Sequence, residues 1–508
     1  MRNCWQKRTT DCSAGARDLS PLIYGLVALA LSLSMLFAID RTSLGAFTPD
    51  TADYLSYDSM RQPLYGLWAN SLFKIFGDWR AVGYAQLLVL VGALTWYYSE
   101  LLLHGLAGRV AVVICSIGVF FLLKLGVAPL IVILMTEGLF FSGLVLLAAL
   151  AVRASRKHVL DRTLLAMMLI LFLMTQLRPA ALLTLAIPVA VLFVWTKSSS
   201  GSRRLPRALL LIAAYVVLLS LGPVALGKKA FQLGAPGEAL GFTLLPRVGQ
   251  LPLNPSIEQV TLEWRQLAHS WQSVAETLDL TESVLFDAQI QEAIRFELAP
   301  KVLFRSIASR SRENGGGSFW KNADAQIAAR GLAIRWIEVE PRAYIYWSTL
   351  HFLGTLTAAT FASDAQRLRV WRSVRAVDER VWQLAALRDD YPNNSFARSL
   401  KGGTALMYTV IRVLATLMFA GGAFAVVLVT VAILRKRTLH PSVCLGGYGF
   451  AWIALHALAV GLTSFPEFRF VYVTLWGYLF FGTAAIAALS VNKARERVSR
   501  DLWEQSGQ

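Results

Sequence analysis

The feature that most constrains this chain is a series of long, uninterrupted apolar runs. Several of them reach the ~20 residues that a helix needs to cross the hydrocarbon core of a bilayer. Of the 508 residues, 56% are hydrophobic and only 16% are charged. Soluble domains are nearer a quarter charged. The sequence therefore predicts an all-α polytopic membrane protein.

Ten spanning helices account for the apolar runs. The first run is longer than the core of a signal peptide and lacks a small-x-small cleavage site, so we expect an uncleaved first helix. The third run is short, and residues 124–136 are interpreted as its tilted or interfacial continuation. The predicted spans are 22–39, 81–103, 109–123, 138–153, 163–177, 180–196, 208–226, 405–434, 442–463 and 470–490.

The orientation follows from the Lys and Arg residues of the short connecting segments. If the N-terminus is cytoplasmic, the inner segments hold clusters of three or four basic residues, except for one that has Arg109 alone. The short outer loops contribute only Lys124, Arg178 and Arg469. The net charge of +17 is thus largely a signal of topology. Nucleic-acid binding is not needed to explain it, and the four cysteines have no zinc-type, redox or disulfide spacing.

Two outer segments are too long to be simple turns, and they divide the chain. Residues 1–226 are predicted to form a transmembrane core with a first outer loop at 40–80, followed by a mostly helical outer-face domain at 227–404. Residues 405–490 form the last spans, and 491–508 form a cytoplasmic tail. Within the outer domain, the moderately apolar stretch 343–361 is expected to be an amphipathic helix at the interface. A span there would place the basic tail outside.

Unusual polar residues gather at the predicted outer face. An Arg at the end of a membrane helix commonly extends its side chain to lipid phosphates, and a Glu at the start of a helix is stabilised by the positive end of the helix dipole. Together, however, cations and isolated carboxylates suit an anionic lipid phosphate that carries a group to be transferred, with a carboxylate to deprotonate an acceptor hydroxyl. The residues are Asp50, Asp53, Asp58, Arg61, Glu137, Arg178, Lys228, Lys229, Arg412, Glu467 and Arg469.

Four short motifs occur in order along the chain. They are Asp50-x-x-x-Tyr54 with Arg61-x-Pro-x-Tyr65 and LFKIFGDW; Thr136-Glu137; Leu177-Arg178-Pro179; and Glu467-Phe468-Arg469-Phe470 with Tyr472. In this order and topology the chain resembles the GT-C superfamily of integral-membrane glycosyltransferases, near the protein O-mannosyltransferase and aminoarabinose-transferase type. It departs from the pattern at Thr51, where many relatives have Glu, and at Phe470, where Tyr is usual.

The resemblance implies a GT-C-type core and an inverting transfer of a sugar from a polyprenyl-phosphate donor to an outer-face lipid, glycan or protein acceptor. It implies Asp50 as the base, and a second carboxylate that comes from Asp53, Asp58 or Glu137 or else is absent. No cofactor is required, although the outer-face carboxylates leave room for a divalent cation. The setting would be the inner (plasma) membrane, with the active site on its periplasmic face. Substrate contacts would come from Tyr54, Arg61, Tyr65, Glu137, Arg178, Glu467 and Arg469.

Two other functions fit parts of the pattern. A transporter or flippase for lipid-linked saccharides would favour paired repeats and polar groups near the bilayer midplane, whereas the polar groups here cluster at one face. An O-antigen-type ligase or polymerase would place its essential groups mainly in one large late loop, without the first-loop Asp. The sequence specifies neither the sugar nor the acceptor.

Overall fold

The computed structural model describes residues 20–39, 44–46, 55, 63–156, 160–178, 184, 244, 248, 323–358, 405–435, 440–463 and 468–489. Within these residues every regular element is a helix, and six helices are long and apolar enough to cross a membrane. The chain is therefore an all-α, multi-pass membrane protein. The elements are α2 (Ser20–Ser34), η1 (Met35–Ala38), α4 (Pro63–Phe76), α5 (Arg80–Leu102), α6 (Gly105–Leu122), η3 (Leu123–Val127), α7 (Ala128–Val132), α8 (Glu137–Arg156), α9 (Leu160–Leu177), α17 (Ala323–Val339), α18 (Pro341–Leu356), α23 (Ala405–Leu434), α24 (Pro441–Thr463) and α25 (Phe468–Ala488).

Eight of the ten predicted spans coincide with described helices. Six of those are the long apolar helices α5, α6, α8, α23, α24 and α25, while α2 and α9 are shorter apolar helices. The predicted span 208–226, and all of 180–196 except Thr184, lie outside the described residues. The total of ten spans thus stays a prediction.

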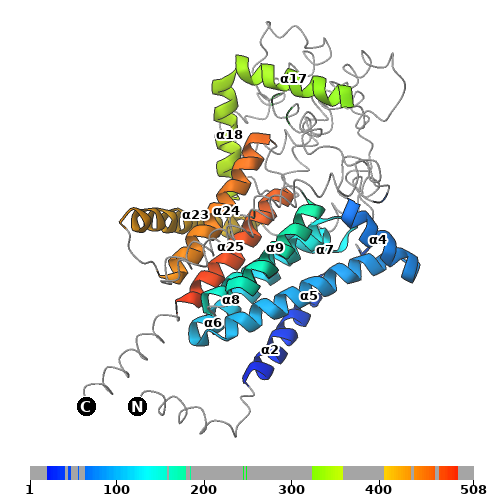
Figure 1. Cartoon of the computed structure of the whole chain (residues 1–508), viewed down its shortest axis with the longest axis vertical. Coiled ribbons are helices and arrows are strands. Elements are labelled where there is room, and N and C mark those ends of the chain that lie inside the picture. Colours follow the sequence, from blue (N-terminus) through cyan, green and yellow to red (C-terminus); the bar gives the residue numbers. More distant parts are fainter. Residues whose placement is uncertain are drawn as a thin grey trace.

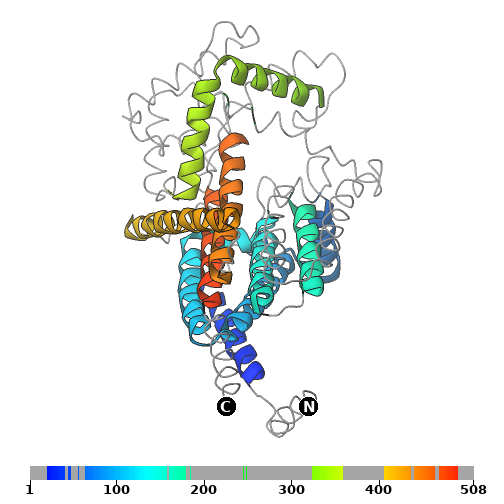
Figure 2. The ribbon, with the colours of Figure 1, turned by 60° about the vertical axis from the view of Figure 1, so that its left-hand side comes forward.

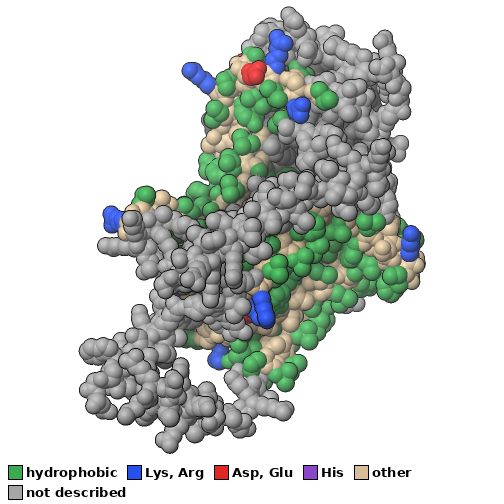
Figure 3. All heavy atoms as spheres, viewed as in Figure 1, with side chains coloured by type: hydrophobic (Ala, Val, Ile, Leu, Met, Phe, Trp, Pro, Cys, Tyr) green, Lys and Arg blue, Asp and Glu red, His purple; other side chains and the backbone are tan. Residues whose placement is uncertain are grey.

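The bundle is built around α5, α8 and α25, which run side by side in the same direction (Figures 1 and 2). The Tyr97 hydroxyl of α5 donates to the Phe480 carbonyl of α25 at 2.6 Å, and Trp476 Nε1 donates to the Phe141 carbonyl of α8 at 3.3 Å. Burying these polar groups in apolar surroundings is tolerated because each one has a partner. Hydrophobic side chains cover much of the described surface of the bundle in Figure 3, as expected for helices that face lipid.

The second half of the segment that joins α6 to α8, residues 130–136, is buried in the protein. For 124–136 the sequence predicted a tilted or interfacial continuation of the third span; Lys124 is exposed, whereas Ile131, Ile133 and Leu134 are almost fully buried. Irregular backbone at membrane depth is tolerated only where the protein satisfies its hydrogen bonds. Here the Gly45 N–H donates to the Val132 carbonyl at 3.0 Å, and the Leu134 N–H donates to the Ala46 carbonyl at 3.1 Å. The start of the first outer loop is therefore anchored to this buried segment.

Helix α18 lies along α24 and extends its direction beyond the rest of the bundle, with α17 turned across its far end (Figure 1). The Tyr344 hydroxyl donates to the Leu462 carbonyl at 2.7 Å. A Cβ at Gly461 would lie 2.7 Å from the Ser348 carbonyl oxygen, so only glycine permits this close approach. With 16 residues, α18 is shorter than the ~17 that a single span requires. It packs beside α24, and its predicted position at the membrane interface stays a prediction.

Candidate functional site

Five helix ends meet at one end of the bundle, which we call the Glu137 end. Gln86, near the start of α5, donates from Nε2 to the Met135 carbonyl just before α8, at 2.8 Å. Arg178, directly after α9, contacts Glu137 at the start of α8. The ring of His456, in the second half of α24, lies 6.2 Å from the ring of Phe470 in the first turn of α25. The starts of α5, α8 and α25 and the ends of α9 and α24 are thus gathered together.

An ion pair between Glu137 and Arg178 lies at the centre of this end. Arg178 Nη1 is 3.0 Å from Glu137 Oε1. The Arg178 side chain is 17% exposed, and that of Glu137 is 1% exposed. The guanidinium also lies over the Phe140 ring, 5.8 Å from its centroid, a distance at which a cation is attracted to the ring face. As the first residue of α8, Glu137 is further stabilised by the positive end of the helix dipole. The pair fixes the guanidinium while leaving part of it accessible.

Next to the pair, an apolar cluster joins α4, α5, α9 and the buried segment before α8. Its buried members are Tyr65, Ala69, Val82, Leu134 and Leu177. Gln86 Nε2 donates to the Tyr65 hydroxyl at 3.1 Å. Leu55 packs against the same cluster, and its carbonyl accepts a hydrogen bond from Asn70 Nδ2 at 3.2 Å. The first outer loop is thus attached to the Glu137 end at two points, residues 44–46 and residue 55.

His456 adds a buried imidazole to the Glu137 end. It is 7% exposed, and its ring lies 6.3 Å from that of Trp452. The positive charge of Arg178 acts on the imidazole, which also hydrogen-bonds the backbone of Phe470. Among the described residues, its Nε2 has no hydrogen-bond partner. One nitrogen of this imidazole is therefore buried and unpaired within the described residues.

The sequence-predicted site residues fall into two groups. Tyr65, Glu137 and Arg178 lie together at the Glu137 end. The backbone of Arg469 is in the first turn of α25, at the same end. Within the described residues, no group of three or more His, Cys, Asp or Glu side chains could hold a metal ion. The other predicted residues lie outside the described part of the chain: Asp50, Asp53, Tyr54, Asp58, Arg61 and Glu467.

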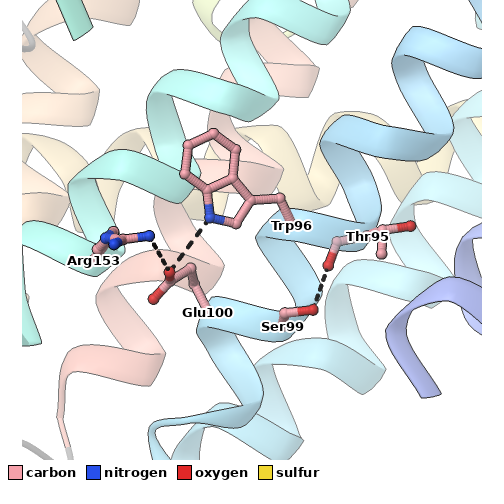
Figure 4. Close-up of polar contacts among 5 residues, drawn as sticks. All are labelled: Thr95, Trp96, Ser99, Glu100 and Arg153. Carbon is pink, nitrogen blue, oxygen red and sulfur yellow. Dashed lines mark hydrogen bonds and ion pairs between the residues drawn. The ribbon is translucent and has the colours of Figure 1, made fainter. Parts of the chain in front are cut away.

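A second ion pair lies at the opposite end of α5 and α8, which we call the Glu100 end (Figure 4). Arg153 Nη1 is 3.4 Å from Glu100 Oε1, and Trp96 Nε1 donates to the same oxygen at 3.3 Å. The Arg153 side chain is 40% exposed and that of Glu100 is 6% exposed. In the sequence analysis, Arg153 served only as one of the basic residues that indicate the topology. Its greater exposure separates this pair from the one at the Glu137 end.

Sequence reasoning missed Gln86 and His456. Both are polar residues inside predicted apolar spans, which was the available signal. Neither belongs to a motif, and their partners lie far away in the sequence. Gln86, for example, is 49 residues from Met135.

No family model matches the chain, and neither the curated proteins nor the solved structures contain a significant match. The fold and the site therefore define the class directly. It is a multi-pass helical membrane protein with a buried polar site at one end of its bundle, beside an anchored loop.

Proposed function

We propose that the protein is a membrane glycosyltransferase that moves a sugar from a polyprenyl-phosphate donor to an acceptor hydroxyl. One observation carries the proposal: the Glu137–Arg178 pair holds a partly accessible guanidinium at the end of the bundle to which the first outer loop is attached. A charged group inside a membrane bundle is costly and usually marks a site of function. The acidic motif of the GT-C-like pattern lies in that same loop.

In this proposal Arg178 binds the donor's phosphate. Nη1 is engaged by Glu137 at 3.0 Å, so the guanidinium offers its other N–H groups to the ligand. A planar fork of donors suits phosphate oxygens and stabilises the charge that develops on a departing phosphate. Glu137 acts as a positioning residue, because it holds the fork in place and is too buried to meet an acceptor.

Asp50 is the proposed base. The acceptor oxygen attacks the anomeric carbon, the bond from that carbon to the phosphate oxygen breaks, and polyprenyl phosphate leaves with inversion of configuration. The acceptor's proton passes to the Asp50 carboxylate. Asp50 follows the anchored residue Ala46 by four positions, and four residues of chain span at most about 14 Å. The base is thus tethered close to the end of the bundle that holds Arg178.

The first test is Asp50→Asn, which is nearly isosteric and removes the base. Losing a general base typically slows transfer by about 10²–10⁴-fold, so cells that rely on this variant should accumulate the lipid-linked sugar and lose one sugar from an envelope glycan. Mass spectrometry of both pools in cells with and without the protein would identify donor and acceptor together. Near-normal glycans with Asp50→Asn would remove Asp50 as the base.

Glu338→Gln is the matched control. Glu338 is an exposed residue of α17 and belongs to none of the four motifs, so this variant removes a carboxylate from the predicted outer-face domain and should leave transfer unchanged. Loss of transfer in both variants would indicate a general effect of charge and would argue against a base at Asp50.

A further inference from the structure

Helix α4 is packed against the protein at its start and exposed at its end. Tyr65 and Ala69 are buried in the cluster beside the Glu137 end. In the last turn, Ile75 is 71% exposed and Phe76 is 64% exposed. Of the 14 residues of α4, only Lys74 is charged. Large apolar side chains that lie together on a surface mark a site of interaction, so the end of α4 is suited to an apolar partner.

The turn between α4 and α5 has a well-defined shape. The Gly77 N–H donates to the Phe73 carbonyl at 2.7 Å. Gly77 has a φ of 69°, the left-handed conformation with which glycine commonly ends a helix. The rings of Phe73 and Trp79 are stacked, with their centroids 4.2 Å apart. The Asp78 carboxylate accepts a hydrogen bond from the Arg80 N–H at 2.8 Å. The exposed apolar end of α4 is therefore carried by a folded turn.

This turn lies at the boundary of the membrane, because the candidate span α5 begins at Arg80. The 23 residues of α5 rise about 34 Å, slightly more than the ~30 Å of the hydrocarbon core. Tyr84 and Leu88, one and two turns further along, are exposed, as expected for a helix that faces lipid. Phe76 precedes Arg80 by four positions, which limits their separation to about 14 Å. The end of α4 is therefore held close to the bilayer surface.

The residues around the exposed end match the chemistry of that surface. Tryptophan is enriched where a membrane meets water, and Trp79 lies in the turn. Lys74 and Arg80 are exposed. Such side chains can keep their stems in apolar surroundings while their charged ends reach lipid phosphates. A bilayer interface thus offers partners for the apolar side chains and for the cations together.

We propose that the end of α4 inserts into the membrane interface, with Ile75 and Phe76 among the upper parts of the acyl chains. Lys74 and Arg80 then lie at the level of the lipid phosphates. The partner is the lipid bilayer itself, and the inference does not rest on the proposed function. The first outer loop, 40–80, is thereby attached to the bilayer as well as to the Glu137 end of the bundle.

The test measures the depth of a fluorescent label at position 75 in the full-length protein, reconstituted in vesicles of phosphatidylcholine and phosphatidylglycerol. Cys4 and Cys12 are replaced by Ser, and the buried Cys115 and Cys444 are kept. Ile75→Cys then carries the label on an exposed side chain. Lipids with brominated acyl chains quench a label from within the membrane, and iodide quenches it from the water.

Two reference positions calibrate the measurement. Leu88→Cys places the label on the exposed face of α5 within the span, and Glu338→Cys places it on an exposed residue of α17. An interfacial helix buries its apolar face about 5–10 Å into the headgroup boundary. We therefore expect brominated lipid to quench the label at 75 at least about twice as strongly as the label at 338. Iodide should quench the label at 75 less than about half as strongly as the label at 338.

Each other outcome would overturn the inference. Strong iodide quenching with weak lipid quenching at 75, as at 338, would place the turn in water. Protection from both quenchers would mean that protein covers the turn, and dilution of the protein in the vesicles would restore quenching only where a second copy covers it. Phe76→Cys replaces Ile75→Cys if the first variant does not fold. Transfer measurements on Asp50→Asn are separate from these results, so the failure of one proposal leaves the other standing.

Discussion

The Glu137–Arg178 pair allows a sharp test of the packing at the Glu137 end. The perturbation is a double-mutant cycle made of Glu137→Gln, Arg178→Leu and the double variant. The interaction energy is the change in unfolding free energy of the double variant minus the sum of the changes in the two single variants. The same cycle on Glu100 and Arg153, with Gln and Leu, provides a matched pair in the same bundle.

The structure predicts a large difference between the two cycles. Two unit charges 3.0 Å apart attract by about 5–6 kcal/mol at an effective dielectric constant of about 20. Removing Arg178 leaves a carboxylate that is 1% exposed without its partner, and breaking a buried pair in this way costs about 3–5 kcal/mol. Arg153 is 40% exposed and its contact is longer, at 3.4 Å. Screening should reduce that coupling to about 1 kcal/mol or less.

The assay is equilibrium unfolding of the purified protein in mixed detergent–SDS micelles. The chain contains 15 Trp residues, so intrinsic fluorescence can follow the transition. We expect Arg178→Leu to be more destabilising than Glu137→Gln, because the carboxylate that remains after the first change is less exposed than the guanidinium that remains after the second. The double variant should be more stable than the sum of the single effects predicts. Circular dichroism would establish that all variants keep their helical content.

Two results would refute this reasoning. Additive single effects at Glu137 and Arg178 would mean that the two charges do not interact in the folded protein. Equal coupling in the two cycles would mean that burial does not control the strength of the pairs, and the distinction between the two ends of the bundle would be lost.

Three further predictions concern the framework. Gly83→Ala places a Cβ 2.7 Å from the Val132 carbonyl oxygen and should destabilise the protein by about 1–3 kcal/mol. Gly92→Ala, whose new Cβ has no atom within 4 Å, is the control and should leave the stability unchanged. Equal melting temperatures of the two variants would exclude the close approach of Gly83 to Val132. Tyr344→Phe removes the hydrogen bond to Leu462 and should cost about 1 kcal/mol of unfolding free energy, and an unchanged value would show that the bond contributes nothing. A cysteine at position 155 should resist impermeant thiol reagents added from the predicted outer side, while cysteines within 240–330 should react. Labelling at 155 would reverse the predicted topology.

The sequence predicts the helices well because hydrophobic length is a local property. Runs such as 81–103 and 470–490 correspond to α5 and α25 with shifts of one or two residues at their ends. The charge bias and the order of the runs also predict that Glu137 and Arg178 lie at the same face of the membrane. The positions of the spans and their orientation depend on how readily each side chain enters lipid and on where Lys and Arg occur, and both can be read from the sequence.

The contacts within the site could not be predicted in the same way. Glu137 and Arg178 are 41 residues apart, and only the packing of α8 against α9 shows that they form a pair. The buried course of 130–136 depends on hydrogen bonds to residues 44–46, which no local pattern encodes. Gln86 and His456 stand alone in apolar runs, so their roles emerge only when their neighbours are known.

In the proposed mechanism, the pairing at the Glu137 end also limits where the base can be. Glu137 Oε1 already accepts the Arg178 guanidinium, and with 1% exposure this carboxylate cannot meet an acceptor hydroxyl. A general base must come within hydrogen-bond reach of the proton that it removes. In the proposed mechanism the carboxylates of the first outer loop and Glu467 therefore remain as candidates, and residues 44–46 attach that loop to the segment just before Glu137. Comparing Asp50→Asn with Asp53→Asn, Asp58→Asn and Glu467→Gln should locate the base, whereas Glu137→Gln should weaken donor binding through the misplaced guanidinium. A Glu137→Gln variant that binds the donor normally and fails only in transfer would reverse these assignments and make Glu137 the base.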